Sequence, residues 1–413
     1  MDTKQTTPIV FGLNLNGCPE PLISPTGSSP DILIIGGGVT GLVTAWVLLD
    51  RGYKVTIVAK EWGTYTSKQR LTSQIAGALW EFPPAACGQH TDIISLSHSR
   101  HWCMIAYKVW EAMAADPVLS AASGVRMRTS AFYFTSKIED TPSQLVKMLE
   151  IQNSGVKGFR RNIDIIHTQD LNPTVGVVDA YEHLAPVIDT DTAMKWLMGL
   201  VQGKGAKLVT ETIHGSLLSQ EQNLRARLSA DVIVNATGLA GAEIAGGNTC
   251  YPIRGALLRV INDGKDFEKV SNALVLTADD AGNAVNEMVF IVPRNENILL
   301  LGGIAQPNEC NLDLTLDSAV IQRIRQRCET FLPRLKNARL DLEYPLAQGL
   351  RPFRKCNVRL ERELGEHDIE EGLPSKRSRI VHSYGHGGAG WSLSFGCAED
   401  AVGLIEDILR EGM

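Results

Sequence analysis

Residues Asp31–Gly41 read DILIIGGGVTG and give the strongest indication of the fold. A short apolar strand over 31–35 runs into a glycine cluster, and a helical pattern follows over 40–50. Gly52 ends that helix, and Val55–Ala59 supplies a second apolar strand. A strand, a helix and a second strand in this order predict an α/β domain built on a parallel sheet.

The glycine cluster fits the pattern G-x-G-x-x-G in the context that gives it meaning. In that pattern the first glycine permits a tight turn, the second lets a pyrophosphate come close, and the third lets the helix pack on the strand. The predicted dinucleotide contacts are Gly36, Gly38, Val39, Thr40 and Gly41. A ribose-binding acid is expected after the second strand, where Lys60 and Glu61 stand. Glu61 is the candidate, and a surface charge is the alternative.

Further elements of the same kind are scattered along the chain. A helix over 191–201 precedes a strand over 206–212, and DVIVN at 231–235 is another buried strand. Between these pieces, a helical pattern covers 91–116 and β-rich segments cover 125–134, 253–262 and 286–304. We therefore expect a discontinuous Rossmann-like domain with a largely β second domain inserted. Residues 1–30, rich in Pro, Gly, Ser and Thr, predict an extended arm.

Composition excludes several classes of protein. The 413 residues are 44% hydrophobic, enough for a large core, and 40 Lys+Arg face 46 Asp+Glu. This balance favours neither nucleic acid nor an anionic membrane as a partner. No apolar run approaches the ~20 residues of a membrane helix. The N-terminus lacks a signal pattern and the chain ends Glu411-Gly412-Met413, not in a peroxisomal tripeptide, so we expect a cytoplasmic protein.

The cysteines predict neither disulfides nor a metal site. Eight are scattered without paired spacing, which suits reduced thiols. The one cluster worth weighing is Cys87, His90, His98, His101 and Cys103, but it lacks the close ligand pairs typical of zinc sites. Ordinary helix residues are the preferred interpretation, and no metal is expected.

A second glycine cluster stands near the C-terminus, as GHGGAG at 385–390. A separate nucleotide site would need its own helix and strand afterwards, and the chain has too few residues left. We expect this loop and the following helix N-terminus to return to the first cofactor, where a positive helix end stabilises negative charge on a reduced ring. His386 is interpreted as a positioning residue, with a general base as the alternative.

Taken together, the sequence resembles the D-amino-acid oxidase family of FAD-dependent oxidoreductases. The matching segments are collinear from residue 31 to about 410. They are the first glycine motif, TSQIAGALW (72–80), DVIVNATG (231–238), PIRG (252–255), GLRP (349–352), VRLERE (358–363) and YGHGGAG (384–390).

The resemblance implies an FAD domain over 31–85, 190–250 and 349–413, and a substrate domain over 86–189 and 251–348. It also implies which further residues line the cofactor. These are Thr72, Ser73, Ala78, Leu79, Ile213, Thr237, Gly238, Gly387, Gly388, Gly390, Trp391 and Ser392.

At the substrate end, Arg351 matches the arginine that holds the substrate carboxylate in that family. A guanidinium suits this role because it is always charged and bonds a carboxylate with two donors. The Gly388 carbonyl is expected to help position the amine. Phe290 and Asn286 stand where the family has tyrosines, so a hydroxyl is lost above the flavin. Glu81 either holds or deprotonates a substrate ammonium or is a surface residue.

We therefore expect an FAD-dependent oxidase that converts an amino acid or related amine to an imine by hydride transfer to flavin, with dioxygen reduced to hydrogen peroxide. One alternative is a specialised biosynthetic oxidase of a secondary amine or modified amino acid, with glycine- or sarcosine-oxidase-like chemistry. Another is a flavin-binding protein without turnover. Substrate identity, stereochemistry and oligomeric state stay open.

Overall fold

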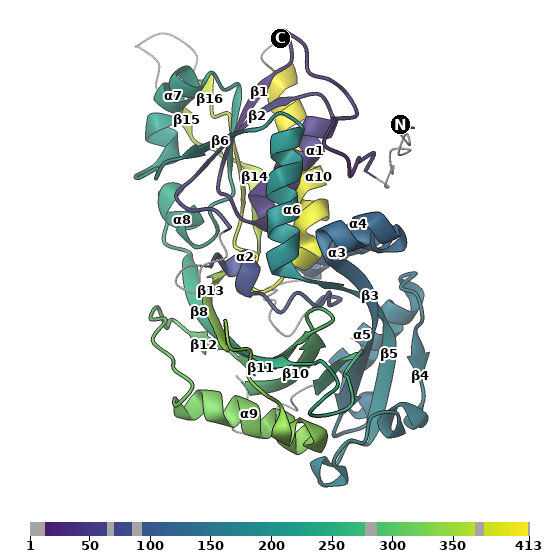
Figure 1. Cartoon of the computed structure of the whole chain (residues 1–413). Coiled ribbons are helices and arrows are strands. Elements are labelled where there is room, and N and C mark those ends of the chain that lie inside the picture. The colour runs from purple at the N-terminus through teal and green to yellow at the C-terminus, as the bar shows by residue number, and fades with distance from the viewer. Residues whose placement is uncertain (1–12, 64–69, 85–92, 277–286, 368–375, 412–413) are drawn as a thin grey trace, which may run out of the picture.

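The computed structural model describes residues 13–63, 70–84, 93–276, 287–367 and 376–411. Two sheets form its two halves, with the smaller, mostly parallel sheet above the larger one in Figure 1. The predicted α/β class is confirmed.

The first sheet has six strands in the order β14-β17-β7-β1-β2-β6. Their bounds are Arg359–Arg362, Ile380–Tyr384, Val232–Asn235, Asp31–Ile35, Lys54–Ala59 and Lys207–Thr210. All neighbours run parallel except β14 and β17. The sheet is therefore assembled from segments far apart in the sequence, as predicted.

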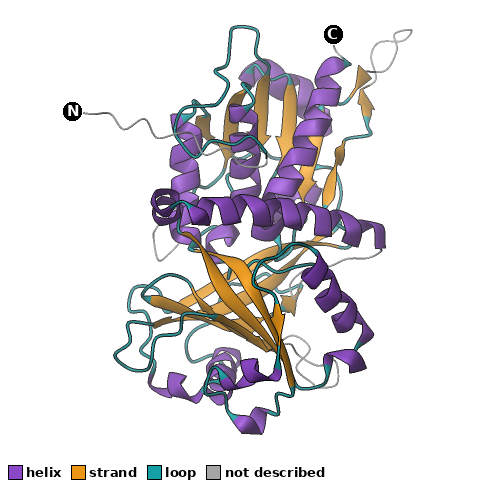
Figure 2. Cartoon of the chain, turned by 90° about the vertical axis from the view of Figure 1, so that its right-hand side faces the viewer, coloured by secondary structure: helices purple, strands orange, loops and turns teal. Residues whose placement is uncertain are grey.

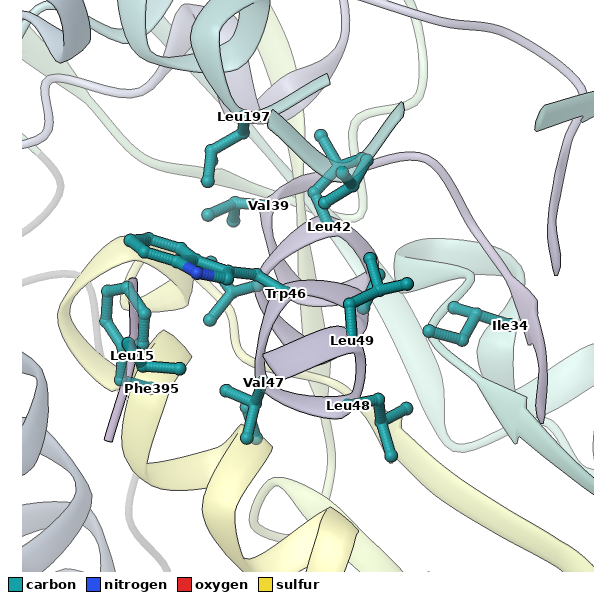
Figure 3. Close-up of a cluster of buried hydrophobic side chains, with 14 of the residues drawn as sticks. Leu15, Ile34, Val39, Leu42, Trp46, Val47, Leu48, Leu49, Leu197 and Phe395 are labelled. Atoms are coloured by element: carbon teal, nitrogen blue, oxygen red, sulfur yellow. The ribbon is translucent and has the colours of Figure 1, made fainter. Parts of the chain in front are cut away.

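Helices cover both faces of this sheet. The helices with extensive buried faces are α1 (Val39–Asp50), α3 (Ile93–Ala115), α6 (Thr190–Gly203), α7 (Leu217–Leu228) and α10 (Gly390–Arg410). Alternate residues of β1 point to opposite faces, so Ile34 packs with α1, α6 and α10 while Leu33 packs with α7. Figure 3 shows Leu15 and Phe395 on the same side of Trp46 of α1, and the ring centroid of Phe395 lies 5.5 Å from that of Trp46.

The second sheet has the strand order β12-β8-β11-β10-β9-β3-β5-β4, with β13 also paired to β8. The bounds are Gln306–Pro307, Cys250–Ile261, Ile298–Ile304, Glu287–Pro293, Ala273–Leu276, Val125–Phe134, Asp179–Ile188, Arg160–Arg161 and, for β13, Leu346–Arg354. Figure 2 shows it as one broad twisted layer beneath the smaller sheet. Helix α9 (Ala319–Phe331) packs Ile324 and Phe331 against its outer face.

Smaller elements complete the described chain. They are α2 (Thr72–Ile75), α4 (Pro117–Ser123), α5 (Pro142–Asn153), α8 (Gly241–Ile244), the hairpin β15 (Glu366–His367) with β16 (Lys376–Arg377), and 3₁₀ turns at Ile138–Asp140, Ile163–His167, Pro173–Val175, Gly238–Ala240 and Pro333–Asn337.

The structure differs from the expected organisation in three segments. Residues 349–354, assigned to the cofactor domain, belong to β13 of the second sheet. Helix α3, assigned to the substrate domain, packs Trp110 into the core of the first. The described part of the N-terminal arm has no helix or strand, yet Leu15 is fully buried in that same core. Each segment is placed by tertiary packing, which local sequence pattern does not reveal.

Among the described residues, no helix combines the length and hydropathy needed to cross a bilayer. The same residues contain no cluster of His, Cys, Asp or Glu arranged to hold a metal ion. Cys87 and His90 lie outside the described part of the chain.

Candidate active site

The turn after β1 is shaped by glycines for steric reasons. Gly36 has a φ of +126°, and a Cβ there would lie 2.2 Å from the carbonyl oxygen of Ala236. A Cβ on Gly41 would lie 2.0 Å from the carbonyl oxygen of Gly36, so α1 can pack against the turn only without one. The turn therefore sits tightly between β1 and β7, as the motif predicts.

A cavity of about 480 Å³ lies beyond this turn, at the carboxyl ends of β1, β2 and β7, and extends to the second sheet. Nearly every cofactor residue expected from the sequence lines it. These are Gly36, Gly38, Val39, Thr40, Lys60, Glu61, Thr72, Ser73, Ala78, Leu79, Ile213, Thr237, Gly238, Gly387, Gly388, Gly390, Trp391 and Ser392. Gly41 is not in the lining, because it faces the turn and supports it from behind.

The C-terminal glycine loop lines the same cavity. Gly385 and Gly387 have φ angles of +84° and +57°, which let the chain turn from β17 into α10. The indole of Trp391, in the first turn of α10, donates to the Ser73 carbonyl at 2.8 Å. The N-terminus of α10 thus borders the cavity, and its partial positive charge stabilises an anionic group there.

His386 in this loop is neutral at ordinary pH. Burial lowers its pKa to about 4. Its Nε2 has no hydrogen-bond partner among the described residues. A neutral, enclosed imidazole supports the interpretation as a positioning residue better than that of a general base.

The wall formed by residues 74–81 is held by a residue that the sequence analysis did not single out. Arg294, at the end of β10, is buried and donates to the carbonyls of Ile188 at 3.0 Å and Ala76 at 2.7 Å. The main chain continues along β5, where Leu79 bridges to Val187. An arginine after Pro293 carries no motif, so only the three-dimensional contacts reveal this anchor.

Arg351 faces the cavity from β13. Its Nη1 donates to the Ile304 carbonyl at 2.9 Å, and its guanidinium lies over Gly255, where a Cβ would come within 2.5 Å. Among the described residues, no carboxylate forms an ion pair with it. A fixed guanidinium with donors left over can bind a carboxylate ligand.

The wall around Arg351 is mostly apolar. The ring of Phe290 lies over Gly77, where a Cβ would be 2.6 Å from Cε1, and Met288 and Leu257 lie nearby in the lining. The phenyl ring offers no hydrogen bond. Asn286, the other residue expected here, lies outside the described residues.

Glu81 also lines the cavity, but its surroundings differ from both expectations. Its Oε1 accepts from the Nζ of Lys147 at 2.7 Å, and Lys147 also donates to the Pro84 carbonyl at 2.9 Å. The side chain of Lys147 is only 9% exposed. Glu81 is therefore neither an isolated carboxylate nor a surface residue, but one half of an internal ion pair.

Charged groups gather at the far end of the cavity. Lys60 and Glu61 approach each other at 3.7 Å, and Glu211, not anticipated from the sequence, lines the cavity beside them. Two bonds of 2.7 and 2.9 Å from Arg227 hold Glu211 and lower its pKa. Acids after β2 and β6 suit the hydroxyls of a ribose.

These observations fit FAD. A glycine turn admits a pyrophosphate, acids stand at the end expected for the adenosine, and a second glycine loop with a helix N-terminus stands where the redox ring is expected. The fold and the cavity thus define a dinucleotide-dependent oxidoreductase with a separate sheet over the reacting end. The chain belongs to the DAO family of FAD-dependent oxidoreductases, whose model matches residues 31–404.

Two relatives of this chain are named as D-amino-acid oxidases. A D-amino-acid oxidase of Rubrobacter xylanophilus is 32% identical over 90% of this chain and 94% of its own length. One of Streptomyces coelicolor is 30% identical over 91% and 96%. Among solved structures, glycine oxidase from Bacillus cereus superposes with a TM-score of 0.64 at 18% identity, covering 92% of this chain and 98% of that one. An FAD-bound L-α-glycerophosphate oxidase from Mycoplasma pneumoniae gives 0.64 at 16%, covering 92% and 95%. These structures establish the shared fold.

Proposed function

We propose that this protein is an oxidase of amino acids, converting the α-amine of a carboxylate-bearing substrate to an imine while dioxygen becomes hydrogen peroxide. The observation that carries the proposal is Arg351, a fixed cation that faces the cavity without an ion-pair partner among the described residues. A cation in this position favours a substrate with an anionic group. The names of the two relatives point to the same class of substrate.

The residues of the chain bind and orient the substrate. The chemistry that FAD supplies when bound is acceptance of two electrons from the substrate and their delivery to dioxygen. Arg351 holds the carboxylate and so fixes the position of the α-carbon. Phe290, Met288 and Leu257 keep water away from the reacting end. No side chain must take the hydrogen from carbon, in keeping with a neutral His386.

A direct test is anaerobic reduction of the purified holoprotein. Bleaching of the flavin absorbance is followed with D-amino acids, glycine, sarcosine and proline, and peroxide is measured after air is admitted. We expect bleaching with at least one D-amino acid and one peroxide per turnover. Bleaching by sarcosine or proline alone would favour a secondary-amine oxidase, and no bleaching by any of them would overturn the proposal.

Arg351→Ala should raise KM by roughly 100-fold, since a hydrogen-bonded charged contact is worth about 3 kcal/mol. Arg351→Lys should recover part of this loss, because the charge remains while the two-donor geometry is gone. Arg354→Ala is the matched control on the same strand, as its guanidinium bonds to Thr249 and Asn357 and is not in the lining. An unchanged KM in the Arg351→Ala variant would remove this residue from the substrate site.

A further inference from the structure

We propose that Glu81 is a specificity-determining residue that accepts hydrogen bonds from a cationic group at the far end of the substrate side chain. The preferred substrates are then basic amino acids, with an ammonium or guanidinium several bonds away from the α-carbon. This inference rests on the proposed function and names the substrate class of the same site.

Glu81, and not Lys147, is the member of the ion pair that meets the cavity. Glu81 lines the cavity and its side chain is 22% exposed, whereas Lys147 is outside the lining and is 9% exposed. Lys147 comes from α5, behind the wall, and its second bond goes to the Pro84 carbonyl. The acid is therefore the charge presented to a ligand, and the lysine holds it from behind.

The ion pair of Glu81 and Lys147 lies against aromatic side chains. The elements packed behind Glu81 contribute aromatic and neutral groups, among them Trp80, Tyr107, Tyr181 and His183. Burial raises the pKa of Tyr181 and lowers that of His183 to about 4, so both stay neutral at ordinary pH. An ion pair in such surroundings adds little stability over an apolar pair of similar size, which favours a role in binding for the pair that meets the cavity.

The carboxylate of Glu81 can accept more than one hydrogen bond. A carboxylate offers about four acceptor positions, so it can bind more than one donor at a time, and Lys147 is one donor to Glu81. A ligand cation can therefore approach the carboxylate while Lys147 remains bound. Lys147 also fixes the orientation of the carboxylate before a ligand arrives, which lowers the entropy lost on binding.

Opposite charges stand at separate places along the cavity. Arg351 enters from β13 at one end of the second sheet, and Glu81 follows the segment that bridges to β5 near the other. The strands between β13 and β5 contribute apolar residues to the cavity lining, among them Leu257 of β8 and Phe290 of β10. A molecule with a carboxylate, an aliphatic chain and a terminal cation matches this order of charges.

Two substrates of similar shape test the proposal. D-lysine and D-norleucine differ chiefly by the terminal ammonium, so the ratio of their kcat/KM values isolates its recognition. We expect the wild-type ratio to exceed one and to fall about tenfold in Glu81→Gln, which keeps the shape and loses the charge. Glu111→Gln is the matched control, because Glu111 also pairs with a lysine, Lys157 at 3.0 Å, outside the cavity lining.

Other outcomes would overturn it. An equal loss for both substrates would mean that Glu81 holds the α-ammonium, and faster turnover of D-glutamate than of D-lysine would mean that Lys147 is the recognising group. A second measurement needs neither turnover nor a folded variant. Wild-type protein is titrated with 6-aminohexanoate and hexanoate, and binding is followed by perturbation of the flavin spectrum. Tighter binding of hexanoate would sink the inference, whereas absent turnover with tighter binding of 6-aminohexanoate would sink only the oxidase proposal.

Discussion

The two sheets that enclose the cavity contribute to it in different ways. The six-stranded sheet contributes two glycine-rich main-chain segments, the turn at 36–38 and the loop at 386–390. The nine-stranded sheet and the segment paired with it contribute side chains, chiefly Arg351, Phe290 and Glu81. A site made of main chain tolerates few substitutions and fixes the cofactor. A site made of side chains can change its substrate by single replacements.

Acidification should produce the largest loss of stability. It should affect the half built on the six-stranded sheet, the cofactor half, more than the half built on the nine-stranded sheet, the substrate half. Burial lowers the pKa values of His382 and His386 in the cofactor half, and of His183 in the other, to about 4. The unfolded chain then binds these protons more tightly, so the stability they contribute is complete above pH about 6.5 and is lost as the pH falls toward 4. At pH about 5 the expected loss is about 2 kcal/mol per histidine.

Urea midpoints measured at several pH values, together with flavin fluorescence, check this expectation. Because two of the three histidines belong to the cofactor half, we expect flavin release to accompany unfolding. His183→Phe should keep the ring stack with Phe132 and remove about a third of the pH dependence. Midpoints that do not change between pH 7 and pH 5 would contradict the prediction.

The buried ion pair of the cofactor half should affect stability alone. Asp50 and Lys204 meet at 2.6 Å with side chains 1% and 0% exposed, and Asp50 also accepts from the Trp46 indole and from the main-chain N–H of Asn16. Asp50→Asn should lower the free energy of unfolding by about 3–5 kcal/mol, because it leaves a buried lysine without its counter-charge.

The ion pair of Asp50 and that of Glu81 should differ in their effect on substrate preference. In the Asp50→Asn variant, the D-lysine to D-norleucine ratio should stay at its wild-type value. Asp31→Asn, which alters an exposed pair with Lys54 at 3.5 Å, is the control and should cost at most about 1 kcal/mol. A shifted substrate ratio in Asp50→Asn would show that the two halves are coupled.

Gly41→Ala should weaken flavin binding. The added methyl group would meet the Gly36 carbonyl oxygen at 2.0 Å, and relieving that overlap moves the turn against which the pyrophosphate lies. Overpacking of this kind costs about 1–3 kcal/mol, or roughly 10- to 100-fold in affinity. Equilibrium dialysis of the flavin measures it. Gly199→Ala in α6 is the control. Its added methyl group would have no neighbour within 4 Å, so the affinity for flavin should not change.

The same division explains how far the sequence could predict the structure. Glycines required by sterics recur in fixed patterns, so the turn at Gly36 and the loop at Gly387 were predictable with their shared cavity. Long-range side-chain contacts leave no local signal. Glu81 meets Lys147 across 66 positions, and Arg294 anchors Ala76 across 218. The N-terminal segment likewise reads as an arm, although Leu15 and the bond from Asn16 to Asp50 hold it in the core.

Phe290→Tyr should produce the smallest of these changes, a gain in affinity for a carboxylate ligand, and it tests the substrate half directly. A hydroxyl on this ring would add one hydrogen bond to a carboxylate held by Arg351, worth about 1 kcal/mol, so affinity should rise about fivefold. Titration with hexanoate measures the gain, and hexanamide, which lacks the charge, should gain less. The ring already lies over Gly77, so the substitution adds a single oxygen to an established position. Weaker binding of hexanoate would show that the ring edge points away from the carboxylate, and the missing hydroxyl would then have no bearing on substrate affinity.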